Sequence, residues 1–143
     1  MKTLFFDIKD HIDPEEDAFL LKGLIANALE RSSPPYSEQA LSIIVRDDAG
    51  HIIAGLTGKT FWNWLYIDTI WVEKEQRKSG LGRQLVEKAE REAITRGCHS
   101  AYLWTEDFEG EGFYPKLGYQ QFVEKADFPN GHRRIGFMKR IAA

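Results

Sequence analysis

The sequence predicts an α/β fold of the α+β kind: a mixed, mostly antiparallel central sheet with one parallel strand pair and helices on both faces. Three observations predict it. Apolar, β-branched runs separated by tight turns fill residues 41–72, as in an antiparallel meander. A long amphipathic pattern follows over residues 81–96. A short apolar segment at 101–104 comes next, and a right-handed crossover would make it parallel to the strand before the helix.

In the first half of the chain, residues 3–8 have the pattern of a strand, and a helix is expected to begin at Pro14. Asp13 is placed to cap that helix, Pro14 suits its first position, and Glu16 can reach back to the cap. Apolar residues then recur at helical spacing up to the Ser-Ser-Pro-Pro loop at 32–35. Three antiparallel strands should follow, at residues 41–46, 51–61 and 64–72, with turns at 47–50 and at Asn63.

In the second half, the helix at 81–96 should end at Gly97, since glycine favours the position after a helix. A buried strand at 101–104 is expected next, and then a short helix at about 110–117. Strands at 119–123 and 134–139 complete the pattern. The elements form one continuous series, so a single domain spanning residues 1–143 is predicted.

Composition favours an ordinary soluble domain. The 143 residues are 43% hydrophobic and 29% charged, with a net charge of −3 and no basic arm, so nucleic acid is not the expected partner. No run approaches the ~20 apolar residues that span a bilayer, so no membrane association is expected. The single cysteine, Cys98, cannot form an internal disulfide, which fits the cytoplasm. The four histidines are scattered, so no metal site is predicted.

The segment from residue 77 to residue 83 is the strongest functional signal. It lies between a predicted strand and a predicted helix, where backbone N–H groups at a helix start can face an anion. Its sequence lacks both the Gly-Lys-Ser/Thr ending of a nucleotide-binding P-loop and the third glycine of a dinucleotide fingerprint. What remains is the pattern R-x-x-G-x-G, in which arginine can bind phosphate through two hydrogen bonds. Its members are Arg77, Lys78, Ser79, Gly80, Leu81, Gly82 and Arg83.

This pattern resembles the coenzyme A-binding signature of the GNAT superfamily of N-acetyltransferases. A second segment, Phe-Tyr-Pro-Lys-Leu-Gly-Tyr at 113–119, is similar to the closing F-Y-x-K-x-G element of the same family. One helix and one strand fit between the two motifs, as the family requires, and the matching region covers about residues 41–140. The resemblance implies a GNAT-like domain that uses acetyl-CoA as co-substrate and acetylates an amine.

The resemblance also implies roles for single residues. Tyr114 matches the tyrosine that protonates the departing sulfur, although a core aromatic is the alternative reading. A phenol has a pKa of about 10 and so stays protonated until a thiolate forms nearby. Backbone N–H groups near Ile70, Trp71 and Val72 are expected to stabilise the oxyanion. Asp107 stands where the family has an asparagine that contacts the pantetheine arm, and it could instead hold the acceptor's ammonium group.

The general base is left open by the sequence. Asp68 lies in an apolar strand, where burial would raise the pKa of its carboxyl group toward a useful range, but a structural aspartate is an equal alternative. Glu106 is the second candidate and a water relay is the third. A run of four carboxylates at 106–111 could attract a cationic acceptor, or could simply be a solvated loop.

The sequence therefore predicts an N-acetyltransferase that transfers an acetyl group from acetyl-CoA to a primary amine of a small molecule or peptide. The alternative is a non-catalytic module that binds or senses acyl-CoA, which would need neither Tyr114 nor a carboxylate base. A homodimer is the expected oligomer, because two-fold dimers are the commonest.

Overall fold

The computed structural model describes residues 2–143, and its internal contacts separate two units, residues 1–36 and 37–143. Each unit is described by itself. The prediction of one domain over the whole chain stays a prediction. No helix within residues 2–143 combines the length and the apolar character that crossing a membrane requires.

The first unit holds one helix, α1 (Pro14–Glu30), which begins where the sequence predicts. The Glu16 side chain accepts a hydrogen bond of 3.1 Å from the backbone N–H of Asp13, as the capping pattern requires. The strand predicted at residues 3–8 is wrong, since these residues have no regular structure and join no ladder among the described residues. An apolar run of strand-like composition becomes a strand only where a neighbouring strand satisfies its backbone groups.

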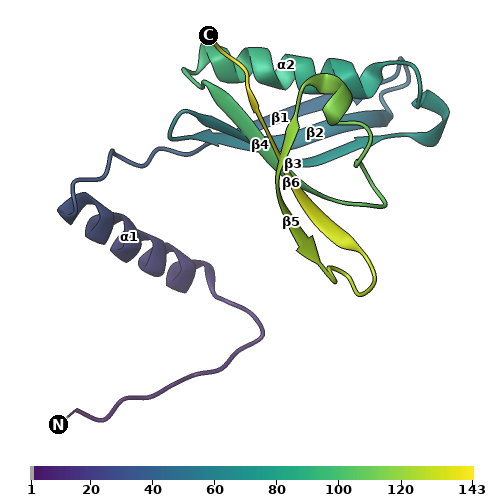
Figure 1. The fold of residues 1–143 in the computed structure, drawn as a ribbon. Coiled ribbons are helices and arrows are strands. Elements are labelled where there is room, and N and C mark those ends of the chain that lie inside the picture. The colour runs from purple at the N-terminus through teal and green to yellow at the C-terminus, as the bar shows by residue number, and fades with distance from the viewer. Residues whose placement is uncertain (1) are drawn as a thin grey trace. The chain divides into compact units, whose positions relative to one another are not determined.

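The second unit is a six-stranded sheet with one long helix (Figure 1). The strands run in the order β1-β2-β3-β4-β6-β5 across the sheet. The elements are β1 (Gln39–Arg46), β2 (Ile52–Phe61), β3 (Trp64–Val72), η1 (Lys74–Gln76), α2 (Leu81–Thr95), β4 (Ser100–Glu106), η2 (Pro115–Leu117), β5 (Gln120–Ala126) and β6 (Arg133–Arg140).

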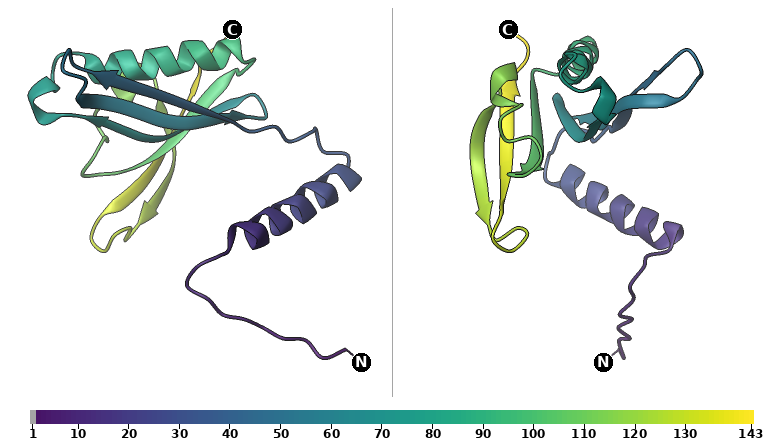
Figure 2. Two further views of the ribbon diagram at one scale, coloured as in Figure 1. Left: turned by 180° about the vertical axis from the view of Figure 1, so that it is seen from behind. Right: turned by 90° about the vertical axis from the view of Figure 1, so that its right-hand side faces the viewer.

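All strand pairs are antiparallel except β3 and β4, which confirms the predicted mixed sheet with one parallel pair. Helix α2 forms the crossover between these two strands and lies along one face of the sheet, as two further views of the unit show (Figure 2). A helix on the other face, which the sequence also predicts, stays a prediction. The parallel pairing is short, running from Trp64 opposite Ser100 to Ile67 opposite Leu103.

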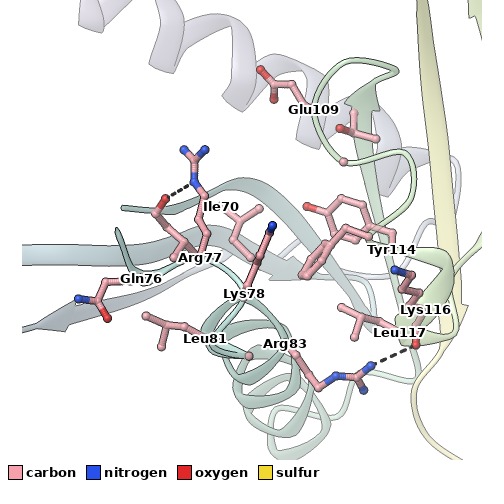
Figure 3. A pocket seen from close by; sticks show the side chains of 16 residues that line it. Ile70, Gln76, Arg77, Lys78, Leu81, Arg83, Glu109, Tyr114, Lys116 and Leu117 are labelled. Carbon is pink, nitrogen blue, oxygen red and sulfur yellow. Dashed lines mark hydrogen bonds between the residues drawn. The ribbon is translucent and has the colours of Figure 1, made fainter. Parts of the chain in front are cut away.

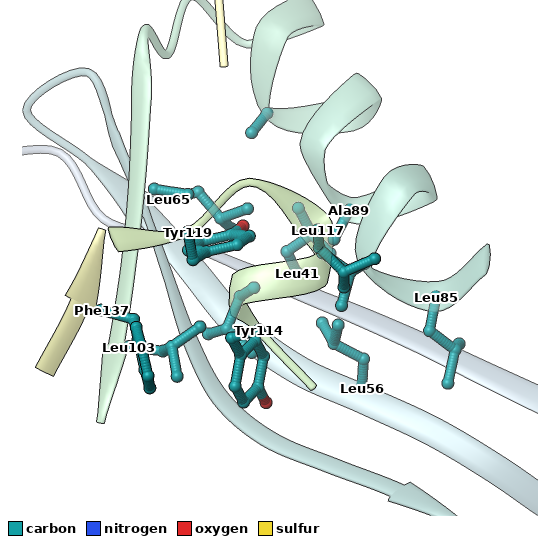
Figure 4. Close-up of a cluster of buried hydrophobic side chains, with 14 of the residues drawn as sticks. Leu41, Leu56, Leu65, Leu85, Ala89, Leu103, Tyr114, Leu117, Tyr119 and Phe137 are labelled. Atoms are coloured by element: carbon teal, nitrogen blue, oxygen red, sulfur yellow. The ribbon is translucent and has the colours of Figure 1, made fainter. Parts of the chain in front are cut away.

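The core lies between α2 and the sheet (Figure 4). Alternate residues of each central strand point into it, and the residues between them face the other way. Leu65 and Ile67 of β3, for example, are buried, whereas Tyr66 is half-buried and Asp68 is exposed. Helix α2 contributes one buried face, made of Leu85, Val86, Ala89 and Ala93.

The short helix predicted at 110–117 is smaller than expected. Residues 107–114 form turns, and only η2 is helical. Gly110, Gly112 and Pro115 interrupt the segment, and each disfavours a continuous α-helix. This irregular segment carries several of the residues that shape the functional site.

Candidate active site

A cavity of about 570 Å³ opens beside the start of α2 (Figure 3). Three structural parts line it: the end of β3, the loop and first turn that begin α2, and the segment from the end of β4 to η2. Its lining residues are Ile70, Val72, Gln76, Arg77, Lys78, Gly80, Leu81, Gly82, Arg83, Thr105, Glu109, Gly110, Phe113, Tyr114, Lys116 and Leu117.

The cavity lies where the parallel pairing of β3 and β4 ends and the two strands separate. Their pairing ends at Ile67 and Leu103, while β3 continues to pair with β2 as far as Val72. The backbone of β3 beyond Ile67 therefore has no β4 partner in the ladder, and Ile70 and Val72 line the cavity. This places the predicted oxyanion-binding segment at the cavity wall, although Trp71 is outside the lining and has an exposed side chain.

One end of the cavity has the features of an anion-binding site, which are a helix start and cationic side chains. Gly80 caps α2 with φ +84°, a left-handed conformation that glycine adopts without strain. The first N–H groups of α2, which have no partner inside the helix, therefore begin at Leu81 and Gly82 in the cavity lining. Lys78 is also left-handed, at φ +67°, a conformation that costs a non-glycine residue roughly 1 kcal/mol and that turns the loop around the helix start.

Two arginines frame this end. The Nε of Arg77 donates a hydrogen bond of 3.0 Å to the carbonyl of Val72, which anchors the side chain to the end of β3. Arg83 reaches the backbone carbonyl of Lys116 at 3.5 Å and the carboxylate of Glu87 at the same distance. Together with Lys78, they give this end of the cavity three cationic side chains, and Lys116 of η2 adds a fourth to the lining beside Tyr114 (Figure 3). Ser79, in contrast, lies outside the lining and donates to the carbonyl of Gln76.

Tyr114 forms the opposite wall. Its side chain is only 4% exposed, and its ring packs against Phe113, Tyr119 and Phe137 at centroid distances of 5.0, 5.8 and 5.9 Å. The hydroxyl points away from this packing, toward the cavity side of the ring (Figures 3 and 4). Burial, with a further contribution from the negative charge of Glu109, raises the pKa of Tyr114 to about 12. The aromatic ring of Tyr114 is thus packed in the core, while its hydroxyl group lines the cavity.

A buried polar network holds Tyr119, which packs against the ring of Tyr114. Tyr119 donates a hydrogen bond of 2.8 Å to Glu90 on α2, and Lys139 on β6 binds both oxygens of the same carboxylate at 3.1 Å. Burial and the adjacent Glu90 carboxylate raise the pKa of Tyr119, so its phenol remains a donor. The network links α2 and β6 to Tyr119, the residue just before β5. The ring of Tyr119 packs against that of Tyr114.

Replacing Glu90 with alanine should lower the free energy of unfolding by about 2 kcal/mol, because Lys139 and Tyr119 lose a charged hydrogen-bond partner in a nearly buried place. Chemical denaturation measures the change. Lys88→Ala, at an exposed position of the same helix, is the control and should stay within about 0.5 kcal/mol of the wild type. An equal effect of the two substitutions would show that the network adds nothing to stability.

Asp107 does not lie where the sequence places it. Its carboxylate accepts hydrogen bonds from Nδ1 of His132 at 3.0 Å and from the backbone N–H of Arg133 at 3.1 Å, and it is outside the cavity lining. Arg133 also contacts the carboxylates of Glu111 and Glu124. Asp107 therefore links the 107–114 segment to the β5–β6 hairpin by hydrogen bonds. This geometry gives no support to a contact between Asp107 and the pantetheine arm.

The two predicted bases also lie outside the lining. Asp68 is exposed, so the expected burial is wrong. The β2–β3 register shifts at this point, from Gly58 opposite Ile67 to Thr57 opposite Thr69, which leaves Asp68 as the extra residue of a β-bulge. It accepts a hydrogen bond of 3.4 Å from the hydroxyl of Tyr66. Glu106 ends β4, opposite Arg134 of β6, and its neighbour Thr105 is the residue that faces the cavity.

Sequence reasoning missed several residues that line the cavity. Phe113, Lys116 and Leu117 belong to the motif at 113–119 that identifies Tyr114, so the motif itself could have indicated them. Glu109 is part of the acidic run that the sequence leaves open. Gln76, Thr105 and Gly110 gave no signal. Within residues 2–143, no group of three or more His, Cys, Asp or Glu side chains is arranged to hold a metal ion.

Fold and site together define a class of transferase. The model of the acetyltransferase (GNAT) family matches residues 6–119, and the chain belongs to this family. It is thus an acyltransferase of the kind that uses an acyl-CoA, and both the predicted resemblance and the predicted fold class are confirmed.

Individual relatives agree. An acetyltransferase of Agrobacterium fabrum is 28% identical over 136 residues, which are 95% of this chain and 98% of that protein. The blasticidin-S acetyltransferase of Streptomyces morookaense is 36% identical over 85 residues, 59% of this chain, and the match spans only 62% of that relative's length. The crystal structure of an acetyltransferase from Bacillus cereus superposes with a TM-score of 0.81 at 27% identity, covering 94% of this chain and 97% of the other.

Proposed function

We propose that the protein transfers the acetyl group of acetyl-CoA to a primary amine of a small molecule or peptide, by direct attack within a ternary complex. One observation carries the proposal: a single cavity is lined by four cationic side chains and the start of α2, and it has the Tyr114 hydroxyl at its wall. The first set suits the phosphates of coenzyme A. The hydroxyl suits the place where the thioester reacts.

The proposed binding mode follows from this layout. Arg77, Lys78, Arg83 and the N–H groups that follow Gly80 would bind the pyrophosphate. The pantetheine arm would then run along β3 between Val72 and Ile70, where the parallel pairing has ended. Backbone N–H groups of that segment would stabilise the oxyanion of the tetrahedral intermediate.

Direct attack is favoured because an acetyl-enzyme would form most readily on a cysteine thiol. None of the described residues that line the cavity is a cysteine, and Cys98, which follows α2 in the chain, is buried in the core. The amine would attack the thioester carbonyl, the C–S bond would break, and Tyr114 would protonate the departing sulfur. A pKa of about 12 makes a resting phenol a weak acid. The positively charged nitrogen of the intermediate would lower it at the moment of transfer.

The acceptor class is proposed from chemistry and from one relative. The blasticidin-S acetyltransferase is named for a small molecule, which supports a small-molecule acceptor here. Calorimetry with acetyl-CoA, followed by thiol release across a panel of amines, tests the whole proposal. Binding without thiol release from any amine would favour the non-catalytic module instead. The cytoplasmic location and the homodimer stay predictions.

The role of Asp68 as the general base is tested by replacing its carboxylate with the amide of asparagine. If Asp68 accepts the proton of the acceptor, Asp68→Asn should remove the acidic limb of the pH profile of kcat/KM, since this limb reports ionisation of the base in the free enzyme. Glu106→Gln is the matched comparison at the end of the neighbouring strand. A folded Asp68→Asn protein with an unaltered acidic limb would exclude Asp68, and loss of the limb in Glu106→Gln would move the role there.

A further inference from the structure

The cavity holds one carboxylate among its described lining residues, and that residue is Glu109. The other charged lining residues are Arg77, Lys78, Arg83 and Lys116, all cationic. Coenzyme A is a polyanion, so a carboxylate in its cavity repels it and is of no use for cofactor binding. A cationic co-substrate is the ligand that such a group would favour.

Glu109 is also set apart from its acidic neighbours. Asp107 binds His132 and the backbone of Arg133, and Glu111 forms an ion pair with the Arg133 side chain. Among the described residues, Glu109 has neither a side-chain hydrogen bond nor an ion pair, and its side chain is exposed. Its carboxylate is therefore available to a molecule that arrives from solution.

The local backbone fixes Glu109 beside Tyr114. The N–H of Glu109 binds the carbonyl of Glu106 at 3.0 Å, and the N–H of Phe113 binds the carbonyl of Gly110 at 3.1 Å. A Cβ on Gly110 would come within 2.7 Å of the Tyr114 ring, so only glycine lets the chain pass this close. The electrostatic contribution of Glu109 to the raised pKa of Tyr114 reflects the same proximity. Figure 3 shows Glu109 and Arg83 at opposite ends of the view, with Tyr114 between them.

We infer that Glu109 receives the ammonium group of the acceptor at the mouth of the cavity and accepts its proton, directly or through one water molecule. This inference rests on the proposed function and assigns to Glu109 the role that the sequence left among Asp68, Glu106 and water.

The proton and electron balance is simple. The acceptor R–NH₃⁺ gives one proton to the Glu109 carboxylate, and the freed lone pair forms the C–N bond to the thioester carbon. When the C–S bond breaks, its electron pair leaves on sulfur, which takes the Tyr114 proton to become the free thiol. The Tyr114 oxygen regains a proton from the new amide nitrogen, and Glu109 releases its proton to water. Acetyl-CoA and R–NH₃⁺ thus give the amide, the thiol and one proton.

Glu109→Gln tests the inference with two nucleophiles. At about pH 7 an alkyl amine with a pKa of about 10.4 is almost fully protonated, whereas hydroxylamine is neutral. The alkyl-amine probe is the member of the panel that the wild type acetylates fastest. We expect kcat/KM for that amine to fall by roughly 10²-fold and kcat/KM for hydroxylamine by less than about 3-fold. The Kd of acetyl-CoA should stay within about 2-fold or tighten.

Glu111→Gln is the control, because its carboxylate lies on the same segment but is held by Arg133 outside the lining. It should leave the ratio of the two nucleophiles unchanged. Equal losses for both nucleophiles in Glu109→Gln, or no loss for either, would overturn the role of Glu109 while leaving the proposed function intact. A wild type that binds acetyl-CoA and acetylates no panel amine would overturn the proposed function and this inference together.

Discussion

Replacing Gly82 with valine should abolish measurable acetyl-CoA binding, a loss of roughly 100-fold or more, or about 2.8 kcal/mol. Gly82 lies in the first turn of α2 and lines the cationic end of the cavity. A side chain there would stand between the backbone N–H groups and the phosphates. Its Cβ would also lie 3.1 Å from the Phe113 ring, so the valine would force that ring, which lines the same cavity, to shift. Calorimetry with acetyl-CoA measures the loss.

Gly112→Val is the control for this result. Gly112 lies in the turns before η2, and a Cβ there would meet nothing within 4 Å. This variant should bind acetyl-CoA like the wild type. Circular dichroism and the melting temperature establish that both proteins fold. A folded Gly82→Val protein with wild-type affinity would mean that the cofactor lies elsewhere.

Tyr114→Phe should reduce kcat by roughly 10²-fold or more, the usual effect of losing a general acid, while the Kd of acetyl-CoA changes little. The substitution keeps the ring and therefore its packing against Phe113, Tyr119 and Phe137. Only the hydroxyl at the cavity wall is removed. Steady-state thiol release with an amine acceptor gives kcat, and calorimetry gives the Kd.

The pH dependence of kcat gives a second check on Tyr114. Burial raises its pKa to about 12, so the phenol keeps its proton below that pH. Deprotonation of Tyr114 should therefore cause no fall in kcat up to roughly pH 10. Tyr102→Phe removes a hydroxyl from a tyrosine outside the cavity lining and is the matched control. Normal turnover by Tyr114→Phe would leave Tyr114 with a packing role alone.

The elements that the sequence predicts best are those with strong local patterns. The sequence predicts a strand at 64–72, and β3 is Trp64–Val72. It predicts a helix at 81–96, and α2 is Leu81–Thr95. Their turns are locally encoded too, because Gly80 and Gly97 both have positive φ at the ends of α2. By contrast, residues 3–8 have a strand-like composition and no strand, because pairing depends on a partner that the local sequence does not specify.

The site residues also fall into those that local motifs predict and those that depend on contacts distant in the sequence. The cationic loop and Tyr114 belong to contiguous motifs, and the structure brings them to one cavity. Asp68 is not buried as the apolar character of its strand predicts, because it is the extra residue at a register shift of the β2–β3 ladder, and the local sequence does not specify that shift. Glu109 could not be singled out from the acidic run. Its difference from Asp107 and Glu111 depends on contacts with Arg133 and His132, about 25 residues away in the sequence.

The short parallel joint between β3 and β4 has a consequence for how the chain folds. The strands β1, β2 and β3 pair through short turns, whereas β4 pairs with β3 and with β6 only after much longer stretches of chain. Pairing across short turns closes small loops and is fast, so we expect both pairings of β4 to form later. The cavity lies where β3 and β4 separate, so we expect it to be completed late in folding. A ligand that binds this cavity would then stabilise the folded state over every state in which β4 is unpaired.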